Sequence, residues 1–508
     1  MVRGIVGLLG VALVLACAGT AAAQEYATAP FSSEVDKSVA FGQAPVFMPD
    51  GRVVFGKDLG AGDGTQIYIA DRDGKNQTCF TCGQPAPNNV PAVRPQGDWI
   101  LFHSWRGHHI TVGSPGFGGL GSSLYVQRAD GKTPVQLTGL DAAHGAGEGE
   151  DDYHAYWSPD GTKLVWAHLN WNFVDDNGNG NWDIRVADFV GADTDHPKLA
   201  NIRVVRPADG HYYETQWWAP DGSGFLYTES YGSSMNNELF FCKLTAKGCD
   251  VERLTNNSAW DEQAIFTPDM KSVIFMSTRD HPGFFNTYAG TAQTAGLPAD
   301  ADFFLTLPLF EAGFLQPVGQ ESTDLYLLDL STRSVRRLTT SGDDGWIVPE
   351  FVWSPDNSHL MWVEARFSDE QRVPFPIDPA AQADRLQKLL ANPPQVKPPS
   401  PGGNQLEAFH LERRTVIGRF AGLPAAPVEG SGDDQGARLL ATLQGWALYA
   451  KPRGAKVCLI AKSHGRTRSR CGARGHTVGP LYLRVSHNRV LRVVLRPNRT
   501  LASRSVKR

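Results

Sequence analysis

The sequence has 508 residues, 41% of them hydrophobic and 20% charged, and a formal net charge of −5. This length is enough for a large buried core and would suggest two to four domains, unless internal repeats build one larger unit. After the N-terminal segment, no apolar run is long enough for a membrane helix.

The N-terminus has the pattern of a signal peptide. Arg3 provides the positive charge, residues 5–16 form a short apolar run, and the small residues 21–23 resemble a cleavage site. We expect residues 1–23 to be removed and the protein to be periplasmic, cell-surface or secreted. An alternative is a lipoprotein-type site that would place a lipid on Cys17.

The six cysteines beyond the signal peptide form three local pairs. The pairs are Cys79 with Cys82, Cys242 with Cys249, and Cys458 with Cys471. An even number of closely spaced cysteines in an exported chain predicts disulfides. The first pair is also a C-x-x-C motif, so a redox or metal site is the competing interpretation; no second such motif completes a zinc site.

A turn motif recurs six times, each time before a short run of strand-forming residues. The turns contain Pro49-Asp50-Gly51, Pro95-Gln96-Gly97, Pro159-Asp160-Gly161, Pro220-Asp221-Gly222, Pro268-Asp269 and Pro355-Asp356. Proline fixes φ, aspartate hydrogen-bonds the turn backbone, and glycine adopts positive φ. Each turn therefore joins two antiparallel strands, and two more strands are predicted after each pair.

Six units of four strands predict an all-β fold, a six-bladed β-propeller over residues 36–422. The motif around Trp157-Ser158-Pro159-Asp160-Gly161 closely resembles the TolB-like family repeat. That resemblance implies a WD-type propeller fold. It is a weak guide to function, because the family includes binding proteins, propellers of certain serine peptidases, and polysaccharide lyases.

Four connections between the second and third strands of a unit are long. They cover residues 103–122, 168–182, 279–322 and 367–404. In a propeller these connections lie on the face opposite the Pro-Asp turns, and long loops in compact repeats are often functional. We expect this face to carry the binding site.

The loop of the third unit contains a calcium-type sequence. Its oxygen-bearing residues are Asp175, Asn177, Asn179, Asn181 (through its carbonyl) and Asp183. Calcium is bound by six to eight oxygens from a tightly turning loop, so this pattern predicts a Ca²⁺ site. The competing interpretation is an Asn-Gly hairpin without metal.

Acidic residues and a histidine lie near the starts of the first strands. They are Asp151, Asp152, His154, Glu214, Asp261, Glu262 and Glu350. Carboxylates beside a histidine can bind a metal or perform acid–base chemistry, and they can equally form a hydrated acidic funnel. We select His154, Glu214, Glu262 and Glu350 as candidate binding residues.

The C-terminal part differs in composition. Residues 423–436 are rich in Pro, Gly and small residues and predict a linker, and residues 437–508 alternate as short strands of a small β-domain. From Lys451 to Arg508 there are 16 Lys and Arg and no Asp or Glu. In an exported protein this predicts contact with an anionic envelope polymer or membrane surface and not with nucleic acid.

These features favour a non-catalytic binding or scaffold protein of the cell envelope with a protein or polysaccharide partner. No G-x-S-x-G nucleophile motif and no phosphate-binding glycine loop occurs in the sequence. The alternative is a metal-assisted carbohydrate-active enzyme, a lyase or hydrolase, with its site at the mouth of the propeller channel. We name no catalytic residues.

Overall fold

The computed structural model describes residues 26–37, 39, 41–58, 65–84, 88–104, 122–131, 133–139, 151–174, 180–230, 237–281, 322–366, 384, 387–388, 391 and 412–421, and strands between 438 and 507. The predicted signal peptide and linker lie outside these residues. Within the described part of the chain, no helix has the length and apolar character that crossing a membrane requires.

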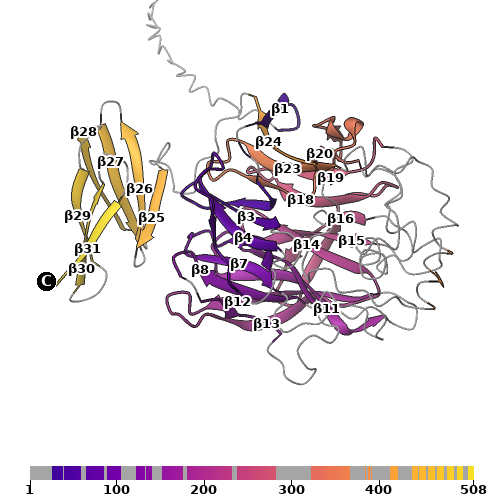
Figure 1. Ribbon diagram of the computed structural model, residues 1–508, viewed down its shortest axis with the longest axis horizontal. Coiled ribbons are helices and arrows are strands. Elements are labelled where there is room, and N and C mark those ends of the chain that lie inside the picture. Colours follow the sequence, from indigo (N-terminus) through magenta and orange to yellow (C-terminus); the bar gives the residue numbers. More distant parts are fainter. Residues whose placement is uncertain are drawn as a thin grey trace, which may run out of the picture.

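Six antiparallel sheets of four strands form the propeller (Figure 1). Blade 1 contains β2 (Gln43–Phe47), β3 (Val53–Asp58), β4 (Thr65–Ala70) and β5 (Thr78–Cys79). Blade 2 contains β6 (Asn88–Val93), β7 (Trp99–Ser104), β8 (Ser123–Arg128) and β9 (Val135–Gln136). Blade 3 contains β10 (Asp151–Trp157), β11 (Lys163–Val174), β12 (Gly180–Val190) and β13 (Lys198–Arg206).

The remaining blades follow the same order. Blade 4 contains β14 (Tyr212–Trp218), β15 (Gly224–Ser230), β16 (Asn237–Leu244) and β17 (Cys249–Arg253). Blade 5 contains β18 (Asp261–Phe266), β19 (Ser272–Ser277), β20 (Asp324–Asp329) and β21 (Val335–Arg337), followed by the 3₁₀ helix η3 (Ser341–Asp344). The all-β six-bladed propeller predicted from the repeat is confirmed.

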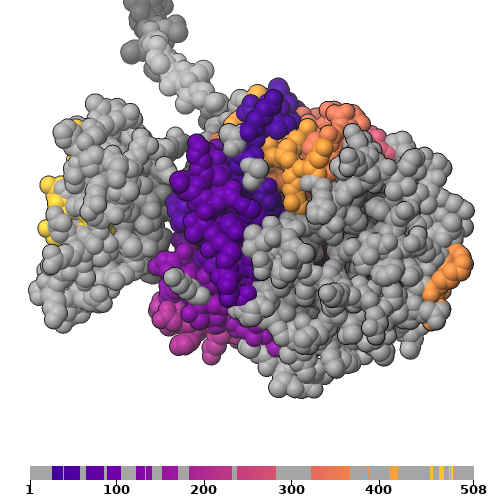
Figure 2. Space-filling model, in the orientation of Figure 1, coloured from indigo at the N-terminus to yellow at the C-terminus, as the bar shows by residue number. Residues whose placement is uncertain are grey.

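Blade 6 joins the two ends of the propeller chain. It contains β22 (Phe351–Trp353), β23 (Leu360–Arg366) and β24 (Glu412–Phe420), and its outermost strand is β1 (Phe31–Asp36). β1 pairs antiparallel with β24, from Phe31 opposite Phe420 to Asp36 opposite Thr415. Figure 2 shows the indigo N-terminal strand beside the orange surface of blade 6. This pairing joins the N-terminal and C-terminal parts of the propeller chain in one sheet.

The first strand of each blade lies at the propeller axis. Contacts connect β2 with β6 and β22, β6 with β10, β10 with β14, and β14 with β18. These strands run from the starts of the blades to the Pro-Asp turns. We call the blade ends with these turns the turn face.

The turns form as their sequence predicts. Asp160 accepts a hydrogen bond from the backbone N–H of Thr162 at 3.0 Å, and Gly161 has φ +66°. Blade 2 has glutamine in place of aspartate, yet its hairpin also forms, with Gly97 at φ +72°. Gln96 donates instead to the carbonyl of Asp160 in the next blade, at 2.8 Å.

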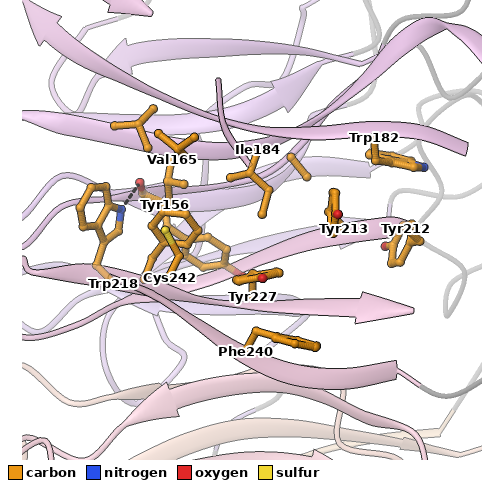
Figure 3. Packing of buried hydrophobic residues seen from close by; sticks show 14 of the residues in the cluster. Tyr156, Val165, Trp182, Ile184, Tyr212, Tyr213, Trp218, Tyr227, Phe240 and Cys242 are labelled. Carbon is orange, nitrogen blue, oxygen red and sulfur yellow. Dashed lines mark hydrogen bonds between the residues drawn. The ribbon is translucent and has the colours of Figure 1, made fainter. Parts of the chain in front are cut away.

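Tryptophans two residues before the turn proline connect neighbouring blades. The Nε1–H of Trp218 donates to the Tyr156 carbonyl at 3.0 Å, as Figure 3 shows. Trp157 donates in the same way to Ala92 at 3.1 Å, and Trp353 donates to Phe266 at 2.9 Å. Each bond satisfies a polar atom inside an apolar interface. The tryptophan of the repeat is therefore a contact between blades.

The main hydrophobic clusters lie between adjacent blades. The largest joins blades 3 and 4 and includes Trp182, Tyr213, Tyr227, Phe240 and Trp218 (Figure 3). A single four-stranded sheet cannot bury both of its faces, so stacking against the neighbours on each side forms the core.

Three disulfides are present, as predicted. They join Cys79 to Cys82, Cys242 to Cys249, and Cys458 to Cys471. The second lies in blade 4, where it joins the fully buried Cys242 of β16 to Cys249 of β17. The first is placed at β5, on the outer edge of blade 1.

The C-terminal segment contains two further sheets (Figure 1). One sheet contains β25 (Arg438–Leu443), β26 (Trp446–Arg453), β27 (Lys456–Ser463) and β28 (Arg466–Ala473). The other contains β29 (Val478–Arg484), β30 (Arg489–Leu495) and β31 (Leu501–Lys507). In the first of these sheets, the disulfide joins Cys458 of β27 to the directly opposite Cys471 of β28. The β-character expected for this segment is therefore present.

Candidate functional site at the propeller axis

A backbone irregularity recurs in the inner strands, five residues before the turn proline. Ala44, Val90, His154 and Gln263 occupy this position in four blades and have φ between +44° and +46°. The strand register shifts at each of these points, as expected for a β-bulge. Positive φ is unfavourable for residues other than glycine and often accompanies functional sites. Two of the four bulge residues, His154 and Gln263, have polar side chains, and both contact Glu214.

Glu214 of β14 makes the most contacts in this region. Its Oε1 lies 2.7 Å from Nδ1 of His154 in β10, and both side chains are buried. Gln216 and Gln263 donate to the same oxygen at 2.9 and 3.1 Å, and the Tyr212 hydroxyl donates to Oε2 at 2.6 Å. Burial opposes ionisation, but His154 and these hydrogen bonds lower the pKa of Glu214 below its usual value.

Glu350, immediately before β22, is a carboxyl group whose pKa is shifted in the opposite direction. Burial and the neighbouring Glu214 raise its pKa, although His154 and the backbone N–H of Ala44 oppose this rise. Its Oε2 atom is buried without a hydrogen-bond partner in the described part of the chain. The residue as a whole is partly exposed. Two nearby carboxyl groups therefore differ in their tendency to ionise.

Acidic groups from three blades act on the pKa of the Tyr156 hydroxyl. Burial, followed by the carboxylates of Glu350, Glu214 and Glu262, raises the pKa of Tyr156 well above its usual value. Glu262 of β18 accepts hydrogen bonds from Trp260 at 2.9 Å and from Asn237 at 3.2 Å. The four predicted binding residues thus come from blades 3 to 6. We call the set His154, Glu214, Gln216, Glu262 and Glu350 the axial cluster.

Two of the other predicted acids are engaged away from this cluster. Asp152 accepts from Nδ1 of His168 at 2.8 Å and from Trp166 at 2.7 Å. Asp261 binds Arg279 at 2.6 Å and Ser277 at 2.6 Å. Both carboxylates are satisfied within their own blades, so the acids near the strand starts do not form one continuous funnel.

His103 of β7 is a buried histidine beside the cluster. The side chain is fully buried, and among the described residues neither ring nitrogen has a hydrogen-bond partner. Its ring centroid lies 6.5 Å from that of His154 and 5.8 Å from that of Tyr153. Burial, and then the neighbouring His154, lowers the pKa of His103 to about 3. At neutral pH this imidazole is uncharged and can both donate and accept.

An apolar layer lies next to the cluster, three residues before each turn proline. Its members are Val46, Ala92, Tyr156, Trp217, Ile265 and Val352. Trp217 comes from blade 4 and packs against hydrophobic clusters that include residues of blades 1, 2, 5 and 6. A side chain that reaches so many blades lies at the axis. The polar atoms are therefore bordered by an apolar layer on the side of the turn face.

The predicted calcium ligands are only partly described. Asp175, Asn177 and Asn179 lie outside the described residues. Asn181 and Asp183 belong to β12, which pairs with β11 in a long hairpin, with Val174 opposite Gly180. The loop expected over residues 168–182 is therefore largely strand. Both carboxylate oxygens of Asp183 accept from Arg185, at 2.9 and 3.2 Å.

Another group of metal-ligating residue types occurs in blade 5. Within the described residues, His281, Asp324 and Asp343 are the one set whose ligand atoms all lie within 4.8 Å of one another. Arg337 lies among them, with its guanidinium 2.6 Å from Asp343. A guanidinium already supplies the positive charge that a metal ion would bring. We interpret this group as an ion-pair network.

Sequence reasoning did not identify Gln216, Trp217, Gln263 or His103. The first three have a detectable signal, because counting back from each turn proline places them on the inner strands. His103 lies on a second strand, where the alternation of its neighbours gives no indication that its ring approaches His154.

Comparisons with known proteins find only distant similarity, and only among solved structures. No family model matches the sequence, and no curated protein matches it. TolB from Acinetobacter baumannii is 15% identical with a TM-score of 0.38, and the match covers 63% of this chain and 62% of that one. The chain thus matches less than two thirds of the Acinetobacter protein.

Two further solved structures are similar to the same degree. A protein assigned as TolB from Agrobacterium tumefaciens is 16% identical, with 58% and 80% coverage and a TM-score of 0.37. An oligogalacturonate lyase in complex with manganese is 12% identical, with 78% and 97% coverage and a TM-score of 0.39. Identities this low carry no functional assignment. The blades and the turn motif define a six-bladed β-propeller.

Proposed function

We propose that this chain is an exported binding or scaffold protein of the cell envelope. Its partner, a protein or a polysaccharide, is bound at the propeller face where the inner strands begin. The observation that carries this proposal is the axial cluster, where Gln216 and Glu350 keep buried oxygens that have no partner among the described residues. Buried polar groups are normally satisfied, so an unsatisfied group requires water or a ligand.

The three disulfides support the proposed export. Such bonds persist in oxidising compartments and are rare in the cytosol. Thiol labelling of the denatured, unreduced protein tests this point. We expect no reactive thiol in the mature protein, and six reactive thiols would contradict export to an oxidising compartment.

Partner capture from envelope extracts tests the binding function. The mature protein is compared with the double variant His154→Ala, Glu214→Gln, and with Asp221→Ala on the turn face as the matched control. We expect the double variant to lose a partner that the control retains. Equal capture by all three proteins would contradict a site at the axis.

A second contact is proposed for the basic C-terminal sheets. Arg468 and Arg470 of β28 are exposed, and the segment from Lys451 onward contains no acidic residue. Such a surface attracts anionic polymers or lipids in a salt-dependent way. Deleting residues 437–508 is expected to abolish the salt-sensitive retention on anionic envelope material. Equal retention of both proteins at low salt would contradict this contact.

A carbohydrate-active enzyme is the second candidate, favoured by one observation. The environments of Glu214 and Glu350 shift their pKa values in opposite directions, which is how a pair of carboxyl groups can serve as base and acid. A screen on envelope and plant polysaccharides, with divalent metals and after chelation, tests it. Turnover that Glu214→Ala abolishes would replace the binding-only proposal.

Calcium binding by the blade 3 hairpin is also proposed, from the oxygen-rich sequence alone. With Asp183 bound to Arg185, the remaining ligands are Asp175, Asn177, Asn179 and the Asn181 carbonyl. Two neutral side chains among them make the site weak, with a dissociation constant on the order of 10⁻⁴ to 10⁻³ M. Calorimetric titration should show binding to the wild type and none to Asp175→Ala. Identical titrations would leave an Asn-Gly hairpin without metal.

A further inference from the structure

The axial cluster has an excess of negative charge over nearby positive charge. Glu214 and Glu350 form no ion pair with a lysine or arginine among the described residues, and His154 is the one basic group that contacts Glu214 there. Arg279, in the same blade as Glu262, is bound to Asp261 instead. The cluster is therefore electrostatically suited to a positively charged ligand.

The unpartnered atoms of this region are mainly hydrogen-bond acceptors. Gln216 is fully buried, and its Nε2 donates to Glu214 while its Oε1 has no partner among the described residues. Oε2 of Glu350 is in the same state. The neutral His103 ring adds one acceptor and one donor nitrogen, and neither has a partner among the described residues. The two side-chain oxygens lack donors within the described chain, so a ligand that fits them carries donors.

The His, Asp and Glu side chains of the axial cluster do not form a compact set of metal ligands among the described residues. Oxygen ligands lie about 2.0–2.6 Å from Mg²⁺ or Ca²⁺, so the ligand atoms crowd within a few ångströms of one another. Within the described chain the one such set of His, Asp or Glu side chains is the blade 5 group, not the axial cluster. A larger organic cation carries several N–H donors that point in different directions.

We infer that the axial cluster binds an ammonium or guanidinium group of the partner, with Glu350 and Gln216 as acceptors. This inference rests on the proposed binding function and names the chemistry that the site recognises. Glu350 as a whole is partly exposed, its Oε2 is buried, and the apolar layer around Trp217 borders the cluster on the side of the turn face. Charge-assisted hydrogen bonds to a buried carboxylate are short and strong.

Calorimetry with simple probes tests the inference on the full-length mature protein. The probes are n-butylammonium and n-propylguanidinium, with 1-pentanol as the neutral analogue of similar length. We expect both cations to bind, the alcohol to be inert, and Glu350→Gln to weaken cation binding at least about tenfold. Glu412→Gln, an exposed carboxylate paired with Arg366, is the matched control and should bind as the wild type does.

Several results would overturn the inference. They are equal binding of the alcohol, binding of Ca²⁺ or Mn²⁺ in place of the cations, absence of any binding, or wild-type affinity in Glu350→Gln. If that variant does not fold, Gln216→Met removes the second acceptor and decides the question in the same way. Competition by a lysine-rich peptide would indicate a protein source for the cation, and competition by glucosamine oligomers a polysaccharide source.

The result is separable from the test of the proposed function. Partner capture that depends on Glu214 but is unchanged in Glu350→Gln would leave the binding function intact and contradict the cationic ligand. Cation binding without any captured partner would support the chemistry of the site and contradict the scaffold function.

Discussion

The turn face and the axial cluster of the same blades differ in how their polar groups are satisfied. At the turn of blade 3, Asp160 accepts from Ser158 and from both the backbone and hydroxyl of Thr162. At the other end of the inner strands, Gln216 and Glu350 keep buried oxygens without partners in the described chain. The turn is complete within the described residues, whereas the axial cluster keeps unpaired acceptor oxygens there.

The comparison separates the role of the recurring turn residues from the role of the axial residues that differ between blades. Turn residues recur in nearly every blade because each blade requires the same hairpin. The axial positions differ from blade to blade, with Glu214, Glu262 and Glu350 on one side of the ring and Gln43 and Asn89 on the other. The recurring turn residues therefore build the ring, and the axial residues that differ between blades give it one acidic side.

The largest expected effect concerns the interface between blades 3 and 4. Trp218→Ala removes a buried indole and its bond to Tyr156, so we expect a loss of about 3–5 kcal/mol in the free energy of unfolding. Trp218→Phe keeps most of the packing and should cost much less. Urea denaturation measures both, and equal losses would show that the hydrogen bond, and not the packing, dominates.

Acid sensitivity should arise beside the axial cluster. The native pKa of His103 is about 3 and its unfolded value is about 6.5, so between these values the unfolded chain binds more protons. Stability from this group is complete above pH 6.5 and is lost as the pH falls toward 3. From pH 7 to pH 5 we expect a loss of about 2 kcal/mol that is absent in His103→Phe.

The control for this measurement is an exposed histidine. His196→Gln should keep the wild-type dependence of stability on pH, because its side chain is outside the core. A wild-type curve parallel to that of His103→Phe between pH 7 and pH 5 would refute the proposed role of the buried imidazole.

Substitutions on the turn face should lower the free energy of unfolding by less, in proportion to the hydrogen bonds that they remove. Asp160→Ala removes bonds to Ser158 and Thr162, and we expect a cost of about 1 kcal/mol. Asp221 accepts one bond within the described residues, from the Ser223 N–H at 2.9 Å, so Asp221→Ala should cost less. Thermal denaturation of the two variants compares them, and the reverse order would contradict the hydrogen-bond explanation.

The sequence predicted the fold far better than the site, for a physical reason. Pro159, Asp160 and Gly161 act on their own turn, and local chemistry can be recognised in a single chain. Glu214 and His154 are 60 residues apart in different blades, and their contact depends on a bulge that no local pattern announces. Asp152 lies near a strand start as they do, but it binds His168 instead.

The smallest effect tests whether the bulges are strained. Val90 has φ +46° in the bulge of β6, where a β-branched residue is strongly disfavoured. Val90→Gly relieves a conformational cost of roughly 1–2 kcal/mol, while glycine adds about 0.5–1 kcal/mol of unfolded-state entropy. We therefore expect Val90→Gly to be neutral or up to about 1 kcal/mol more stable by urea denaturation. The matched variant Val54→Gly, in regular strand β3 and fully buried, should be clearly destabilised. If Val90→Gly loses as much stability as Val54→Gly, the bulge is an unstrained part of the strand. A stability gain would instead show that the inner strands tolerate strain where their polar side chains meet at the axis.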